Sequence, residues 1–188
     1  MKAESIARNY NIDISACSHN DTDVKSIKNI VKSFYCAKWK DTVSNSCSSV
    51  NSSLRLYKLF KRSFSIDPYL LCVTNDKHRS ALSRFRCSSH QLQVEKCRHQ
   101  ANIPPIWERV CPFCRCAVDD ELHLLLFCRT NANLRCDFMS SIAHLIPNLD
   151  AMHHLDQFTN IISSSDKFVL RKLAKFVYNS LEIRKCLI

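Results

Sequence analysis

The chain has 188 residues, of which 46% are hydrophobic, and a formal net charge of +10, a length that fits one domain or one domain with an appendage. Glycine is absent, whereas average usage of about 7% would give roughly a dozen, so Walker loops and dinucleotide-binding turns are excluded. Tight type I′ hairpins are also disfavoured. We therefore expect a mainly α fold of several short amphipathic helices.

The first segments in chain order are an arm and a helix. Residues 1–20 lack sustained periodicity and are expected to form a loose N-terminal arm. A helical segment over residues 21–100 then begins with one amphipathic helix from Asp21 to about Trp39. Its apolar positions recur at helical spacing: Val24, Ile27, Val31 and Phe34. The polar stretch from Thr42 to Ser53 predicts a loop, after which Leu56, Leu59 and Phe60 begin a second helical stretch.

Two capping signals follow. Asp67-Pro68 predicts the start of a short helix, because Asp caps free N–H groups and Pro is tolerated at the first helical position. Asn75-Asp76 can cap the next helix. In that helix Ala81, Leu82 and Phe85 are expected to face inward, whereas Arg79, Arg84 and Arg86 lie to the sides or outward. Leu92 and Val94 alternate with polar neighbours, so helix and strand remain alternatives there, and Pro104-Pro105 ends any helix.

Residues 101–130 contain a Cys-x2-Cys-x8-His-x4-Cys array. Its members are Cys111, Cys114, His123 and Cys128. The Cys-x2-Cys turn supplies two thiolates, and the last two residues can close a tetrahedral zinc site from a short helix. With four protein ligands no position is left for water or substrate, so the site is expected to be a structural zinc knuckle. The alternatives are buried thiols without metal, or replacement of one ligand by Cys116 or Cys136.

The array is followed by residues 131–188, which are predicted to be a C-terminal helical segment. Just before this segment, the acidic run from Asp119 to Glu121 suits the first turn of the helix that carries His123 and Cys128. That helix is expected to bury Leu122, Leu125 and Leu126. A second amphipathic run aligns Leu134, Phe138, Ile142 and Leu145 and stops at Pro147. The last helix begins near the serines at 163–165 and aligns Leu170, Leu173, Val177 and Leu181.

The positive charge is concentrated before the array. Residues 77–115 carry 8 basic and 2 acidic side chains, a local +6, whereas residues 116–188 carry 8 of each. Such a cluster attracts a phosphate backbone, so RNA or DNA is the expected partner, bound by backbone contacts. The candidate nucleic-acid-binding residues are Arg79, Arg84, Arg86, His90, Arg98 and Arg109. A solvated basic face without a partner is the alternative.

The cysteine content and the apolar runs bear on the compartment. Apolar runs such as Leu124 to Phe127 are far too short to cross a bilayer, and Met1 to Tyr10 does not read as a signal peptide. We therefore expect a cytoplasmic or nuclear protein without a membrane association. Thiols stay reduced there, and clustered cysteines more often bind metal than form disulfides.

Four stretches of the chain carry a resemblance to a known family. They read Arg79-Ser-Ala-Leu-Ser-Arg-Phe-Arg86, Ser89-His90-Gln-Leu-Gln-Val-Glu95, Arg109-Val-Cys-Pro-Phe-Cys114 and Val118-Asp-Asp-Glu-Leu-His123, before a closing Cys128. In order and spacing they resemble the C-terminal zinc-binding region of non-LTR (LINE-type) retrotransposon reverse transcriptases, over roughly residues 52–188. The resemblance implies the four zinc ligands named above, with Arg79, Arg86, His90 and Arg109 as recurring polar positions around them.

The resemblance extends to the tail of such an enzyme and not to its catalytic part. Cys87, Lys96-Cys97 and Leu124 depart from the family pattern. The aromatic-x-Asp-Asp palm motif that holds the metal ions of polymerases is also missing, since Asp119-Asp120 lacks the aromatic residue and lies between zinc ligands. We expect a non-catalytic zinc-binding nucleic-acid-binding module, a fragment or freestanding remnant, with a reverse transcriptase or another protein as a further partner and no small-molecule substrate.

A zinc-scaffolded protein-interaction module, of treble-clef or RING-like character, is the alternative function. A RING domain needs a second set of ligands, which would have to come from Cys87, Cys97, His99 and Cys136. An enzyme is not expected. Zinc deaminases require a His-x-Glu motif, which this chain lacks.

Overall fold

A computed structural model describes residues 21–45, 56–61 and 63–186. The chain divides into two compact units, residues 1–48 and 49–188. Within the described ranges the fold is mainly α, as expected, and the only strand-like pairing there is an isolated bridge between Val110 and Val118. None of the helices in those ranges is both long and apolar enough to cross a membrane. The expected arm over residues 1–20 lies outside the described residues.

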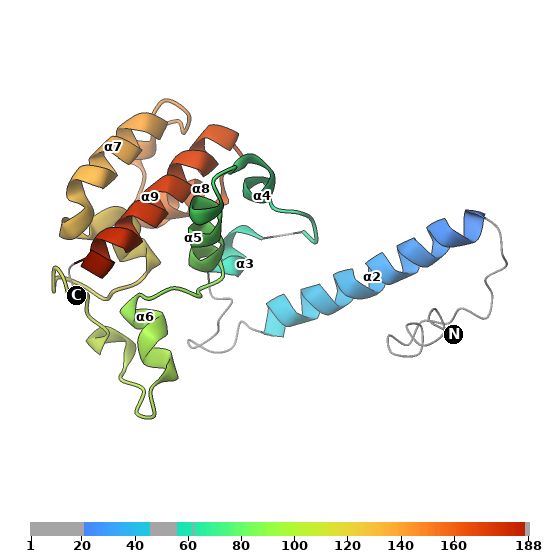
Figure 1. Cartoon of the computed structure of the whole chain (residues 1–188), viewed down its shortest axis with the longest axis horizontal. Helices are drawn as coiled ribbons and strands as arrows, with labels where there is room; N and C mark the ends of the chain where they lie inside the picture. The colour runs from blue at the N-terminus through green and yellow to red at the C-terminus, as the bar shows by residue number, and fades with distance from the viewer. Residues whose placement is uncertain (1–20, 46–55, 62, 187–188) are drawn as a thin grey trace. The chain divides into compact units, whose positions relative to one another are not determined.

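Helix α2 (Asp21–Asn45) is the described part of the first unit (Figure 1). The helix was expected to end near Trp39, but it continues for six more residues. Thr42 is part of this extension, and its hydroxyl donates to the Lys38 carbonyl oxygen at 2.9 Å. A side chain predicted to favour a loop is therefore accommodated inside the helix by a bond to the preceding turn. The rest of the expected loop, residues 46–53, lies outside the described residues.

The second unit is organised around the last helix, α9 (Lys167–Cys186). It packs against α4 (Pro68–Cys72), α5 (Asp76–Arg86) and α7 (Ala132–Ile142) (Figure 1). Its buried apolar face, spaced by three and four residues, consists of Val169, Leu170, Leu173, Ala174, Phe176 and Val177. This face joins the core formed by α5, α7 and the segment at Leu124. Leu124 and Leu125, which lie between two of the candidate metal ligands, thus share one hydrophobic core with the C-terminal helices.

The two predicted caps behave differently. The Asn75 side chain accepts a hydrogen bond from the His78 backbone N–H at 3.1 Å, which confirms the cap of α5. Asp67 precedes α4 but makes no capping bond. Its carboxylate instead accepts from the Lys61 ammonium at 2.8 Å, just after the short helix α3 (Tyr57–Phe60). A buried cation therefore competes successfully for the carboxylate that was expected to cap α4.

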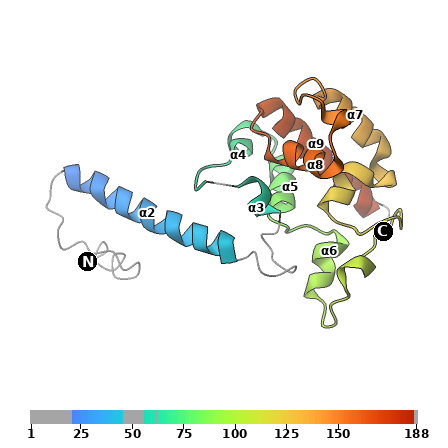
Figure 2. The ribbon, with the colours of Figure 1, turned by 180° about the vertical axis from the view of Figure 1, so that it is seen from behind.

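The stretch left open between helix and strand is helical. Leu92 and Val94 are both buried at the start of α6 (Gln93–Lys96), which continues into the short 3₁₀ turn η1 (Cys97–His99). Pro104-Pro105 precedes a further 3₁₀ turn, η2 (Ile106–Glu108). These elements lie at one end of the unit, at the bottom of Figures 1 and 2.

Helix α8 (His154–Ser163) was not predicted. It follows the 3₁₀ turn η5 (Leu149–Ala151), buries Phe158, Ile161 and Ile162, and packs against α3 (Figure 2). The preceding helix α7 ends at Ile142, so the predicted run to Leu145 is too long, and Leu145 is exposed. Leu134, Phe138 and Ile142 belong to the core or pack against it, as expected.

Candidate metal centre and adjacent groove

The first two candidate ligands lie on a tight turn. The Val110–Val118 bridge closes the loop, within which the Cys111 backbone N–H donates to the Ala117 carbonyl at 2.9 Å. The Arg115 N–H donates back to the Cys111 carbonyl, also at 2.9 Å. Arg115 has a φ of 54°, the left-handed region in which glycine is most easily accommodated. In a chain without glycine an arginine occupies this position, and the turn still brings Cys111 and Cys114 together.

The other two candidate ligands are five residues apart: His123 begins the π-helix η3 (His123–Phe127), and Cys128 directly follows it. In an α-helix, positions five apart point about 140° away from each other, so they cannot share one ligand site. The wider π turn, closed by the Cys128 N–H donating to the His123 carbonyl at 2.7 Å, brings the two side chains to one side. The Asp120 carboxylate accepts from the His123 N–H at 2.7 Å and caps the turn, which agrees with the acidic start predicted for this helix.

The four predicted ligands form one cluster. The ligand atoms of Cys111, Cys114, His123 and Cys128 all lie within 4.8 Å of one another. The sulfurs of Cys111 and Cys128 are 4.0 Å apart, and the Cys114 sulfur is 3.2 Å from His123 Nε2. The two proposed substitute ligands, Cys116 and Cys136, are exposed and outside the cluster. The arrangement is compatible with a metal site. No second such cluster occurs in the part of the chain that the structure describes.

The thiols differ in acidity. Burial raises the pKa of Cys111 to about 12. Burial acts in the same direction on Cys128, but hydrogen bonds from His123 and Arg184 outweigh it and lower its pKa to about 6. The hydrogen bond to Cys128 in turn raises the pKa of His123. Burial also acts to raise the pKa of Cys114, but hydrogen bonds, led by one from the Cys116 backbone, outweigh it and lower that pKa. The cluster therefore already stabilises negative charge on two sulfurs, those of Cys114 and Cys128, and a bound metal ion would extend this to Cys111.

A residue that the sequence analysis did not select lies beside the cluster. Arg184, in the last turn of α9, is only 5% exposed, and its Nη2 atom lies 3.6 Å from the Cys111 sulfur and 3.4 Å from the Cys128 sulfur. Its Nη1 atom donates to Asp119 at 2.7 Å. The sequence carries a signal for this placement, because Arg184 continues the buried stripe of Leu173, Val177 and Ser180 at steps of four, three and four residues.

Three of the six predicted nucleic-acid-binding residues, Arg86, His90 and Arg109, are buried in the structure. Arg86 is 3% exposed, lies over the rings of Phe60 and Tyr69 at 4.4 and 4.8 Å, and donates to the Ile162 carbonyl. The pKa of Arg86 is lowered by burial. Its aromatic and carbonyl partners come from segments far apart in the sequence, which is why the helical pattern alone placed it outward.

His90 and Arg109 are also internal. His90 is 7% exposed, accepts weakly from the Leu92 N–H through Nδ1 and therefore donates through Nε2 to Glu121 at 2.8 Å. Arg109 is 5% exposed and donates to the carbonyls of Pro104 and Val94 at 3.1 and 2.9 Å. These side chains hold the α5–α6 connection and the approach to the Cys turn in place, so they cannot contact a phosphate backbone.

The other three predicted residues reach the surface to different degrees. Arg79 donates to the Val73 carbonyl at 2.8 Å and pairs with Asp76, and Arg98 is half-buried and pairs with Glu95 at 3.0 Å. Arg84 is exposed. Of the six, Arg84 is therefore the one whose charge is most available to a partner.

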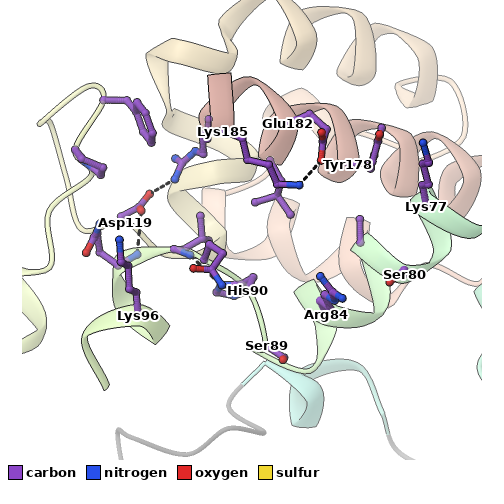
Figure 3. A pocket seen from close by; sticks show the side chains of 18 of the residues that line it. Lys77, Ser80, Arg84, Ser89, His90, Lys96, Asp119, Tyr178, Glu182 and Lys185 are labelled. Atoms are coloured by element: carbon purple, nitrogen blue, oxygen red, sulfur yellow. Dashed lines mark hydrogen bonds and ion pairs between the residues drawn. The ribbon is translucent and has the colours of Figure 1, made fainter. Parts of the chain in front are cut away.

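Arg84 lines a groove with a volume of about 730 Å³. α9 forms one side and α5 with α6 the other, and Pro112 and Phe113 of the Cys turn also contribute to the wall (Figure 3). The basic residues along it are Lys77, Arg84, Lys96, Arg184 and Lys185, and the acidic ones are Asp76, Asp119 and Glu182. Lys77 and Lys96 belong to the basic region over residues 77–115 that the sequence predicts, whereas the contribution of α9 has no local signal, because this helix joins the groove only through the fold.

Arg184 pairs with Asp119, Lys185 with Glu182 and Arg79 with Asp76. Lys77, Arg84 and Lys96 form no ion pair with any residue in the described ranges, and all three are exposed, which gives the groove a positive rim.

No protein-family model, no curated protein and no solved structure matches the chain.

Proposed function

We propose that residues 49–188 form a zinc-stabilised, non-catalytic module that binds nucleic acid, related to the tail of non-LTR retrotransposon reverse transcriptases. The observation that carries the proposal is the groove whose wall includes the metal-binding turn and whose rim is basic. RNA or DNA is the proposed ligand, and a polymerase is a further partner that the family resemblance suggests. The expected compartment remains the cytoplasm or nucleus.

Zinc is the proposed metal because of the donor set and its spacing. A tetrahedral zinc with Zn–S bonds of about 2.3 Å places two sulfurs about 3.8 Å apart and a sulfur and a nitrogen about 3.6 Å apart. The corresponding separations here are 4.0 Å for Cys111 and Cys128 and 3.2 Å for Cys114 and His123. These values support zinc after small side-chain adjustments. Four protein donors fill its coordination positions, so the proposed role is structural and no reaction is assigned to it.

Phosphate contacts supply the proposed affinity. Lys77, Arg84 and Lys96 present three positive charges along one side of the groove, without an acidic partner in the described ranges. Such contacts bind many sequences alike, because the backbone carries the charge and base edges carry the sequence. We expect dissociation constants of roughly 10⁻⁴ to 10⁻⁶ M near physiological salt, with little sequence preference.

A titration of the zinc-loaded full chain with fluorescent single-stranded RNA, single-stranded DNA and duplex DNA, repeated over a series of salt concentrations, tests the proposal. The test variant is Arg84→Ala with Lys96→Ala. The matched control, Lys167→Ala with Lys172→Ala, removes the same charge from the beginning of α9. The groove pair is expected to flatten the plot of log affinity against log salt by about 1.4 to 1.8 units, whereas the control leaves it unchanged.

Two results would count against this function. Binding that is undetectable at low salt removes the nucleic-acid ligand altogether. Equal effects of the two double variants would mean that net charge, and not the groove, determines binding.

A protein-interaction module is the second candidate, favoured by apolar exposure in the segment before the Cys turn. Trp107 is 70% exposed, and Ile103 and Val110 are exposed as well. Aromatic residues are enriched in protein interfaces. Loss of capture of a polymerase fragment in Trp107→Ala, with unchanged nucleic-acid binding, would support the protein-interaction function. Wild-type behaviour of this variant in both assays would contradict it.

A further inference from the structure

Arg184 contacts the metal cluster from outside its ligand set. Its Nη2 atom is 3.4 Å from the Cys128 sulfur and 3.6 Å from the Cys111 sulfur, while Nη1 donates to Asp119 Oδ1 at 2.7 Å. The guanidinium also lies over the Phe113 ring at 5.2 Å from its centroid. One buried side chain from the end of α9 therefore contacts both halves of the metal-binding segment, the Cys turn and the residue that follows the π-helix.

Charge makes this contact significant. A divalent ion bound by three thiolates and a neutral histidine has a net charge of −1, and an uncompensated buried charge is strongly unfavourable. Arginine remains protonated in proteins, and its planar fork can donate to several acceptors at once. Donors around a metal site also orient its ligands and reduce their electron donation.

We propose that Arg184 is the counter-charge of the metal-bound thiolates and the positioning residue that fixes the end of α9 to the metal-binding turn. This inference rests on the metal-binding part of the proposed function and not on nucleic-acid binding. Asp119 holds the guanidinium in place, because its Oδ1 accepts from Arg184 and its Oδ2 accepts from the Gln93 N–H at 3.0 Å. Arg184 would then act on the sulfurs through Nη2 alone.

A purely structural ion pair between Arg184 and Asp119 is the rival explanation. The two roles use different atoms of the guanidinium and can be separated. Asp119→Asn removes the ion pair and leaves the N–H groups that face the sulfurs, whereas Arg184→Met removes both at similar side-chain length. Lys185→Ala is the matched control, since Lys185 is the next residue of α9 but is exposed and pairs with Glu182.

The experiment uses the full chain loaded with Zn²⁺ or Co²⁺. Affinity is measured by competition with a chromophoric chelator, the thiolate-to-Co²⁺ charge-transfer band by absorption, and the exposure of bound thiolates by their rate of alkylation with iodoacetamide. Arg184→Met is expected to weaken zinc binding by about 10- to 100-fold, to shift the charge-transfer band to lower energy, and to accelerate alkylation. Asp119→Asn should have a smaller effect on all three, and Lys185→Ala none.

Arg184→Lys keeps the charge but cannot reach Asp119 and both sulfurs together, so an intermediate affinity is expected. If circular dichroism shows that Arg184→Met has less helix than the wild type, the role of Arg184 is judged from Arg184→Lys instead. Affinity, band energy and alkylation rate equal to wild type in a folded Arg184 variant would overturn the inference, as would equal effects of Asp119→Asn and Arg184→Met. A wild-type chain that takes up neither ion would overturn the proposed metal site as well, whereas loss of nucleic-acid binding alone would leave the inference intact.

Discussion

Arg84 and Arg86 lie two positions apart on α5 in opposite environments. Arg84 is exposed at the groove, whereas Arg86 is buried against two aromatic rings and donates to the Ile162 carbonyl. Removing Arg86 deletes these contacts and leaves a buried carbonyl without a donor, which typically costs 1 to 3 kcal/mol per unsatisfied group. We expect Arg86→Ala to lower the free energy of unfolding by about 2 to 4 kcal/mol in urea denaturation of the metal-loaded chain.

Arg84→Ala provides the control on the same helix. Surface substitutions usually change stability by no more than about 0.5 kcal/mol, so this variant should unfold like the wild type. Equal destabilisation by both variants would contradict the assigned burial of Arg86.

The four clustered ligands are expected to act as a unit. Each of Cys111→Ser, Cys114→Ser, Cys128→Ser and His123→Ala leaves the proposed metal ion with three protein donors and should abolish stoichiometric metal retention after dialysis against a moderate chelator. Apparent zinc binding energies of structural sites are on the order of 10 kcal/mol, so the same changes should also lower the melting temperature. Metal content by mass spectrometry and thermal unfolding check both effects.

Two exposed thiols serve as controls for the ligand variants. Cys116 follows the Cys turn, and Cys186 is the last residue of α9. Cys116→Ser and Cys186→Ser should keep one metal ion per chain. Loss of the ion in Cys116→Ser, with retention in Cys128→Ser, would show that the fourth ligand is misassigned.

Metal affinity should depend on pH with a predictable sign. The pKa of about 12 means that Cys111 holds a proton at pH 7, which a metal ion must displace, whereas Cys128, with a pKa of about 6, has already lost its own. Affinity should therefore rise about tenfold or more per pH unit from pH 7 to 8. Below about pH 6, Cys128 and His123, whose pKa is raised, should also become protonated, so metal affinity should fall more steeply with decreasing pH.

Chelator competition at pH 5.5, 6.5, 7 and 8 measures this dependence. Ionic strength is held constant, so that only proton competition varies. An affinity that is constant from pH 6.5 to 8 would contradict the protonated state assigned to Cys111.

The left-handed backbone at Arg115 predicts a stabilising substitution. A non-glycine residue in this conformation costs roughly 1 to 2 kcal/mol, part of which glycine loses again through its greater freedom in the unfolded chain. Arg115→Gly should raise the free energy of unfolding by about 0.5 to 1 kcal/mol in denaturant titration. Arg115→Ala removes the same charge but not the strain, so a gain of equal size in that variant would assign the effect to charge instead.

The sequence predicted best the features that depend on local periodicity and spacing. Leu170, Leu173 and Val177 recur at helical steps and are buried on α9, and the spacing of Cys111 and Cys114 predicted the turn that brings both residues into the four-residue cluster. Helix α8 was missed although it carries a local signal: Leu155, Phe158, Ile161 and Ile162 recur at steps of three and four residues, and the last three of these are buried.

Contacts between distant segments could not be predicted in this way. Arg86 meets Ile162 across 76 positions, and Arg184 meets Asp119 across 65. A basic residue next to an apolar stripe is expected to be solvent-exposed, because the hydrogen-bond acceptors that would allow its burial come from distant segments and are not visible in the local sequence. For this reason the charge count indicated a basic region correctly but assigned Arg86 and Arg109 to a surface that they do not reach.

The order of synthesis gives the position of Arg184 a further meaning. Cys128, the last of the four ligands, leaves the peptidyl-transfer centre 56 residues before Arg184. At elongation rates of about 5 to 20 residues per second, this interval lasts about 3 to 11 s. A metal ion that binds to the nascent chain in that time contacts the three thiols before Arg184 has been added. The four ligands are therefore synthesised before the guanidinium that balances their charge.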